Sequence, residues 1–148
     1  MPFWIQGWIE VCSHEDTTDE YAWMSVLNLG SLDLGGEFSE YMFGLSKRYV
    51  SEDERAYKAV AANRDLPSNP SKCVREEMIE IKEHELKYGS GEIGGYTYAY
   101  WAEIKSTLSL AKDIDHSEWN VVFSLVDCLQ KYRGYADDKI RLIVWWNW

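Results

Sequence analysis

The sequence lacks the features that mark secreted, membrane-spanning or disulfide-stapled proteins. Its three cysteines, Cys12, Cys73 and Cys128, are odd in number and widely spaced, which excludes a disulfide framework and a C-x-x-C metal knuckle. No basic stretch followed by an apolar run opens the chain, so we expect no signal peptide. The longest apolar runs, such as residues 142–146, are too short to span a bilayer. We therefore expect a cytoplasmic protein that has no membrane partner.

Positive charge is missing from the first third of the chain, where the first basic residue is Lys47. Eight acids precede it and give this segment a charge of −8, whereas 15 basic and 17 acidic residues give the remainder −2. Carboxylates repel phosphates, so we expect no direct nucleic-acid binding by this region and favour a basic protein partner. The alternative is that these acids only keep the surface solvated. The candidate protein-binding residues are Glu10, Glu15, Asp16, Asp19 and Glu20.

Catalytic signatures are also missing. No G-x-S-x-G, H-E-x-x-H or Cys–His pattern occurs, so we expect no catalytic residue, metal or cofactor, with an enzyme of unrecognised type left as an alternative. Residues 89–94 match G-x-G-x-x-G, but a helical pattern precedes them where a dinucleotide site needs a strand, which predicts a connector. Glu80 and His84 lie one helical turn apart, and two ligands alone do not make a metal site.

Aromatic residues are abundant instead, with 8 Trp, 10 Tyr and 4 Phe. Most of these rings are expected in the core, where Trp and Tyr also need a partner for their polar atom. One segment beside the glycine-rich stretch is a candidate platform for stacking a nucleotide-like ligand, and core packing at the start of a helix is the alternative. Its residues are Tyr96, Tyr98, Tyr100 and Trp101.

Hydrophobic periodicity predicts an α+β fold in a single domain that covers residues 1–148. Strands are expected at residues 3–12, 21–27 and 140–148, and helices at 37–49, 51–62, 71–88, 100–112 and 115–133, with glycine-rich loop 89–95. In the first strand, one face carries Phe3, Ile5, Ile9 and Val11, and the other carries Trp4, Gln6, Trp8 and Glu10. We expect an antiparallel sheet that includes both terminal strands, with the helices packed on one face.

Two helices show the clearest buried stripes. In the helix at 71–88 the stripe is Val74, Met78 and Ile81. In the helix at 115–133 it is Trp119, Val122, Phe123, Val126 and Leu129. The second helix is therefore predicted to be the central packing helix.

Four short motifs follow one another along nearly the whole chain. They are Gly7-Trp8-Ile9-Glu10; Arg64-Asp65-Leu66-Pro67 followed by Ser71; Thr97-Tyr98-Ala99-Tyr100-Trp101-Ala102-Glu103-Ile104; and Arg141-Leu142-Ile143-Val144-Trp145. Their order and spacing resemble a family of small hypothetical proteins of bacteriophages and bacterial prophages, with motifs G-W-[IV]-E, R-G-L-P, S-W-L-T-L-A-E-L and R-[LI]-[IV]-x-W. Asp65 stands at the family's glycine, an exchange that disfavours a left-handed turn there. The resemblance implies a phage or prophage origin and no established activity.

Together, the charge and the resemblance predict a small phage-type binding protein. We expect it to block a host protein, specifically a defence component, by presenting an acidic surface in the cytoplasm of the bacterial host. The first alternative is sequestration of a nucleotide-like ligand by an aromatic pocket, and the second is an enzyme of unrecognised type. The sequence leaves the oligomeric state open.

Overall fold

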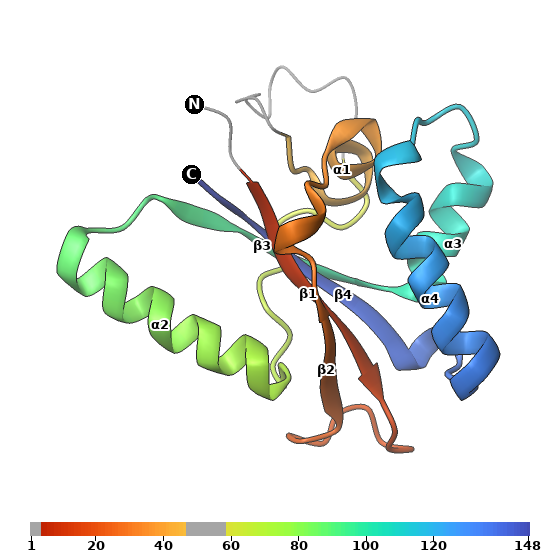
Figure 1. Cartoon of the computed structure of the whole chain (residues 1–148), viewed down its shortest axis with the longest axis horizontal. Helices are drawn as coiled ribbons and strands as arrows, with labels where there is room; N and C mark the ends of the chain where they lie inside the picture. Colours follow the sequence, from red (N-terminus) through yellow and green to blue (C-terminus); the bar gives the residue numbers. More distant parts are fainter. Residues whose placement is uncertain (1–3, 47–58) are drawn as a thin grey trace.

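In the computed structural model, which describes residues 4–46 and 59–148, an antiparallel sheet is sandwiched between helices (Figure 1). The four strands run in the order β2-β1-β4-β3. They are β1 (Trp4–Cys12), β2 (Trp23–Asn28), β3 (Ile93–Tyr100) and β4 (Ile140–Asn147). The main helices are α1 (Gly36–Phe43), α2 (Lys72–Tyr88), α3 (Trp101–Leu110) and α4 (Asn120–Arg133). The predicted α+β class is confirmed.

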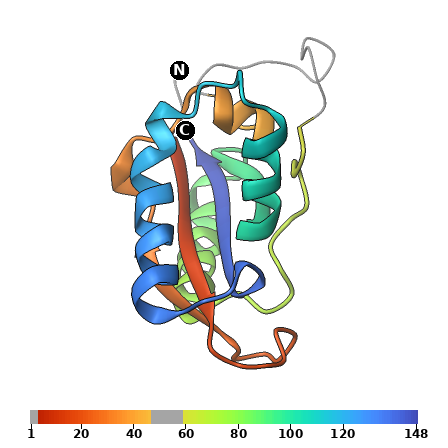
Figure 2. The same cartoon turned by 90° about the vertical axis from the view of Figure 1, so that its right-hand side faces the viewer.

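The two strands nearest the ends of the chain are the central pair of the sheet. β1 and β4 pair antiparallel from Trp4↔Asn147 to Val11↔Ile140 without a register shift. Figure 2 shows them side by side, with α3 and α4 in front. The predicted pairing of the terminal strands is thus confirmed.

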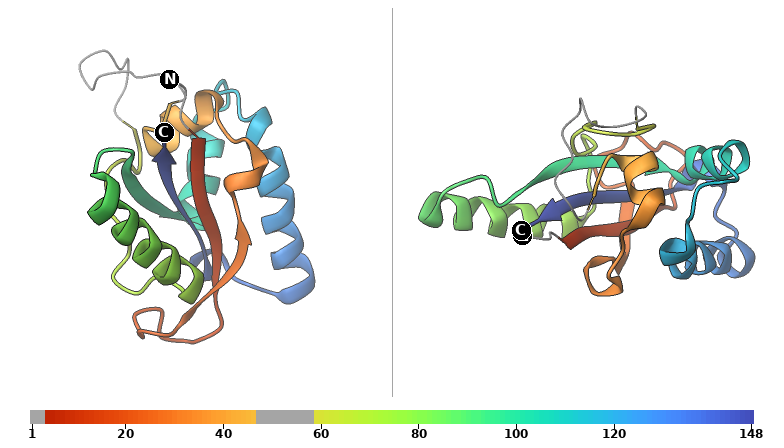
Figure 3. Two further views of the ribbon diagram at one scale, coloured as in Figure 1. Left: turned by 60° about the vertical axis from the view of Figure 1, so that its left-hand side comes forward. Right: turned by 90° about the horizontal axis from the view of Figure 1, so that it is seen from above.

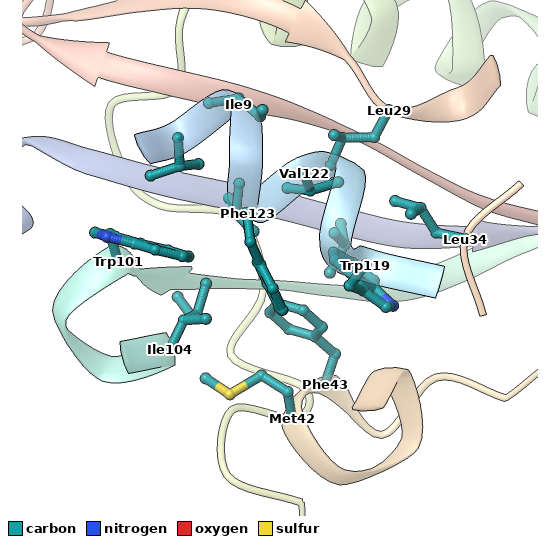
Figure 4. Close-up of a cluster of buried hydrophobic side chains, with 14 of the residues drawn as sticks. Ile9, Leu29, Leu34, Met42, Phe43, Trp101, Ile104, Trp119, Val122 and Phe123 are labelled. Carbon is teal, nitrogen blue, oxygen red and sulfur yellow. The ribbon is translucent and has the colours of Figure 1, made fainter. Parts of the chain in front are cut away.

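The main core lies between the sheet and the layer formed by α1, α3 and α4 (Figure 4). Phe123 of α4 is central to it, with ring centroids 5.2 Å from Phe38 and 5.6 Å from Trp101. Trp119 is fully buried, and its indole N–H donates to Ser39 Oγ at 2.7 Å. α4 therefore is the central packing helix that the sequence predicts. It begins after a 3-10 turn, η3 (Ser117–Trp119), and ends at Gly134, whose φ is 73°.

The opposite face of the sheet is covered by α2 (Figure 3). Val74, Met78 and Ile81 of this helix pack against Ile143 and Trp145 of β4, as their predicted stripe requires. The sequence-based expectation places all helices on one face. In the structure, helices lie on both faces of the sheet, with α1, α3 and α4 on one and α2 on the other. The physical reason is that both faces of β4 are apolar, so each needs a cover. No helix in the described ranges combines the length and apolar character needed to cross a bilayer.

Two further elements differ from the sequence-based expectation. β3 occupies residues that were expected to be partly glycine-rich loop. There Gly95 has a φ of 68°, and a Cβ on it would lie 2.4 Å from Trp146 Cδ1, so this edge-strand position requires glycine. α1 ends at Phe43, because Gly44 turns left-handed with a φ of 69°. The helix expected at 51–62 lies largely outside the described residues.

Candidate functional site

Glu10 and Arg141 form an ion pair inside the protein. They are cross-strand partners on β1 and β4, with Arg141 Nε donating to Glu10 Oε1 at 2.5 Å. Glu10 is 0% exposed and Arg141 is 1% exposed. The prediction that Glu10 belongs to an exposed acidic surface is therefore wrong. The face of β1 that carries Glu10 is partly polar, but α2 and the segment before it cover this face.

The segment that precedes α2 completes this buried pair. The backbone N–H of Ser71 donates to Glu10 Oε2 at 2.6 Å, and Arg141 donates to the side-chain and backbone oxygens of Asn69 at 3.2 and 2.9 Å. The Arg141 guanidinium also lies 3.9 Å from the centroid of the Trp23 ring. Burying two charges is tolerated only when both are paired and their remaining polar atoms are satisfied. The hydrogen bonds of Asn69 and Ser71 therefore tie residues 69–71 to the sheet.

Asn69 extends the polar network from the core to the loop between β1 and β2. Its side-chain amide donates to the carbonyls of Thr17 and Asp19 at 2.8 and 2.9 Å. The indole N–H of Trp23 donates to the same Thr17 carbonyl at 2.9 Å. From the other side, Lys139 Nζ donates to the carbonyls of His14 and Glu15. The backbone of residues 13–20, hereafter the acidic connection, is thus held from several directions.

The acidic side chains of this connection lie at the surface. Glu15, Asp16, Asp19 and Glu20 are all exposed. Hydrogen bonds from the hydroxyl and the N–H of Thr18, at 2.6 and 2.9 Å, lower the pKa of Asp16, and the charge of Lys139 lowers it further. Asp19 accepts a hydrogen bond from the N–H of Tyr21 at 3.0 Å. The structure therefore brings four of the five predicted acids together on one loop.

The four rings proposed as a stacking platform do not form one surface. Trp101 is buried in the main core. The three tyrosines occupy every second position of β3 and therefore share the opposite face of the sheet, which α2 covers. Tyr96 packs 5.8 Å from Trp145, and Tyr100 packs 5.9 Å from Trp23. Burial raises the pKa of Tyr96 to about 12, with a contribution from the negative charge of Glu85. The geometry favours the packing alternative over stacking of a ligand.

A pocket of about 440 Å³ opens between α2 and the sheet. It contains Glu80 and His84, and His84 Nε2 lies 3.3 Å from Glu92 Oε2. Its wall is made by Gln6, Glu77, Glu80, Ile81, His84, Glu92, Ile93, Trp145 and Asn147. Within residues 4–46 and 59–148, no three His, Cys, Asp or Glu side chains are arranged to hold a metal ion. Glu80 and His84 therefore line a polar pocket together, without a third such side chain in a metal-binding arrangement in the described part of the chain.

Glu77 is the least solvated of the carboxylates in this pocket. Burial raises its pKa, the hydrogen bond from Trp8 Nε1 at 2.7 Å opposes the increase, and the charge of Glu80 adds to it. A carboxyl whose pKa is higher in the folded chain stabilises the fold at low pH and loses this contribution as the pH rises through that pKa. At neutral pH the charge of Glu77 is therefore a cost to folding.

The variant Glu77→Gln should be more stable than the original protein at neutral pH. Glutamine keeps an oxygen that accepts from Trp8 and removes the buried charge. The gain should shrink as the pH falls through the raised pKa of Glu77, and it should be gone below about 4.3, the ordinary pKa of Glu, where Glu77 is protonated in both the folded and the unfolded chain. Urea unfolding over this pH range measures the difference, with exposed Glu76→Gln as the control. A gain that is independent of pH, or equal in the control, contradicts the prediction.

Some of these features had a signal in the sequence and others did not. Glu10 and Arg141 each interrupt an apolar strand with a charge, which is a signature of a buried pair, whereas nothing in the sequence marks Asn69 as the link between them. Asp65 does adopt the left-handed turn that the loss of glycine disfavours, with a φ of 68°. Its own carboxylate accepts the N–H of Leu66 at 2.8 Å, which stabilises this conformation.

Comparison with known proteins adds no identification. No family model, no curated protein and no solved structure matches the chain. The resemblance to small phage proteins therefore stays a prediction that the four motifs carry.

Proposed function

We propose that this chain is a binding protein that recognises a basic segment of another protein through the acidic connection. The observation that carries the proposal is the anchoring of this loop. Asn69, Trp23 and Lys139 hold its backbone carbonyls, while its four carboxylates face solvent. A loop fixed in this way loses little conformational freedom when a partner binds. The motif resemblance extends the proposal to a bacterial host protein whose activity is blocked.

The charge of the acidic connection favours a basic partner and sets what binding should look like. Four carboxylates on one loop attract a basic patch at long range and speed the encounter of the two proteins. Lys139 lies beside the loop, where it is engaged with the carbonyls of His14 and Glu15. Each exposed ion pair contributes only about 0.2–1 kcal/mol, so the effect depends on several acids acting together.

The test is a variant that neutralises the loop without changing its shape: Glu15→Gln, Asp16→Asn, Asp19→Asn and Glu20→Gln together. Asparagine keeps the oxygens that accept from Thr18 and Tyr21, so stability should change by less than about 0.5 kcal/mol per site. Association with a lysine-rich probe peptide, and with proteins captured from a bacterial host lysate, should slow, and its salt dependence should flatten. Stopped-flow and surface-binding kinetics at several salt concentrations measure both.

A matched control removes the same charge elsewhere. Its substitutions are Glu83→Gln, Glu118→Gln, Asp127→Asn and Asp138→Asn, all at exposed positions. The association rate of this control should exceed that of the loop variant and should be close to that of the original protein. Unchanged affinity and salt slope in the loop variant, or equal losses in both variants, would show that the acids of the loop only solvate the surface.

A further inference from the structure

The pocket between α2 and the sheet contains a hydrogen-bond donor that the protein leaves unused. Trp145 lines this pocket and is only 1% exposed. Its indole N–H donates to no group in the described part of the chain, yet no described side-chain polar atom is both sealed from solvent and without a partner. The small exposed part of Trp145 therefore includes this N–H, and the pocket is the hollow that the Trp145 side chain lines. A donor beside such a hollow is suited to an acceptor atom on a ligand.

The same pocket has an excess of negative charge. Glu77, Glu80 and Glu92 line it, and none of its described lining residues is Lys or Arg. Glu92 faces His84, and Glu77 accepts from the indole of Trp8, whereas Glu80 forms no hydrogen bond or ion pair with the described residues. Glu77 and Glu80 lie three residues apart on α2, and the charge of Glu80 contributes to raising the pKa of Glu77. A bound cation would relieve this repulsion between like charges.

We infer that this pocket binds an arginine-like group, a guanidinium whose parent chain also carries a carbonyl. The guanidinium lies against the carboxylates of Glu77 and Glu80, and the carbonyl accepts from the indole N–H of Trp145. A planar guanidinium presents several donors in one fork, which suits two carboxylates better than the compact ammonium of lysine. The pocket volume of about 440 Å³ is in the range of small-ligand sites.

This inference goes beyond the acidic connection, which contributes no residue to the pocket. The ligand chemistry is shared by an arginine residue in a peptide and by free arginine. The two sources differ in the groups beside the carbonyl, because free arginine adds a charged amine and a charged carboxylate. The experiment therefore compares a blocked derivative with the free amino acid.

The test follows the indole N–H signal of Trp145 in the full chain by nuclear magnetic resonance. Trp145→Phe identifies this signal by its loss. N-acetyl-L-arginine methylamide should shift the signal saturably, whereas the citrulline analogue, which is neutral and nearly isosteric, should bind about tenfold more weakly or worse, as expected for lost charge-assisted hydrogen bonds. Tighter binding of the blocked derivative than of free L-arginine assigns the site to a peptide, and the reverse order assigns it to the free amino acid.

Variants separate direct contact from the general field of the protein. Glu80→Gln should weaken binding of the arginine derivative by about fivefold or more. Glu83→Gln, one turn away on the exposed side of α2, should change it by less than about twofold. The variant whose acidic connection is neutralised should bind the derivative as the original protein does. The proposal for the pocket and the proposal for the acidic connection are therefore tested independently of each other. No saturable shift, equal binding of citrulline, or equal effects of Glu80→Gln and Glu83→Gln would each overturn the inference.

Discussion

Replacing Arg141 by methionine should lower the free energy of unfolding by about 3–5 kcal/mol, because the change leaves the carboxylate of Glu10 buried without its counter-charge. Asn69 loses the donor to its side-chain oxygen in the same step. Because Asn69 also holds the carbonyls of Thr17 and Asp19, amide hydrogen exchange in the acidic connection should speed up as well. Urea unfolding and hydrogen exchange measure the two effects.

The double variant Glu10→Leu, Arg141→Met is the control for this prediction. An apolar pair removes the uncompensated charge, and replacing a buried ion pair in this way is often close to neutral. Here the backbone N–H of Ser71 and the oxygens of Asn69 still lose their partners, so the double variant should lie between the single variant and the original protein. A loss below about 1 kcal/mol in the single variant, or strictly additive losses, would show that the pair is not coupled.

Replacing Phe123 by alanine should cost about 3–5 kcal/mol, the range for truncating a buried phenylalanine. Phe123 is 9% exposed, its ring packs edge-on against Phe38, and it also contacts the ring of Trp101, which Figure 4 shows in the same cluster. α1, α3 and α4 all meet at this point, so the cavity has little freedom to collapse. Equilibrium unfolding in urea measures the cost.

Leu125 provides the matched control for Phe123 on the same helix. It is 36% exposed, and Leu125→Ala should cost less than about 1 kcal/mol. Similar losses in the two variants would mean that the helix as a whole, rather than the packing of its inner face, responds to substitution.

The strands β1 and β4 were predictable, whereas β3 was not, and the reason lies in local pattern. β1 and β4 are short runs of aliphatic and aromatic residues broken mainly by single polar or charged residues, a composition that is typical of strands. The second and third residues of β3, Gly94 and Gly95, are typical of loops, and the need for them comes from the approach of Trp146, a long-range contact. No pattern within residues 93–100 reports that neighbour.

The candidate sites divide in the same way. The clustering of Glu15, Asp16, Asp19 and Glu20 follows from their closeness in the sequence, so sequence reasoning finds it. The burial of Glu10 depends on α2 and on residues 69–71, which reach it only through the fold. The pocket likewise joins a helix to Trp145, a residue that the sequence places in a strand but not beside any carboxylate.

The central position of β1 and β4 governs how the protein can fold. Glu10 and Arg141, which join the two strands, are separated by 131 positions in the sequence. Contacts of such high sequence separation require closure of a long loop before they contribute energy, which slows folding. During synthesis, at about 5–20 residues per second, β1 remains without its central neighbour until nearly all of residues 4–148 have been made. The nascent chain is therefore exposed to edge-to-edge aggregation for about 6 to 26 seconds, and its yield depends on how well that interval is protected.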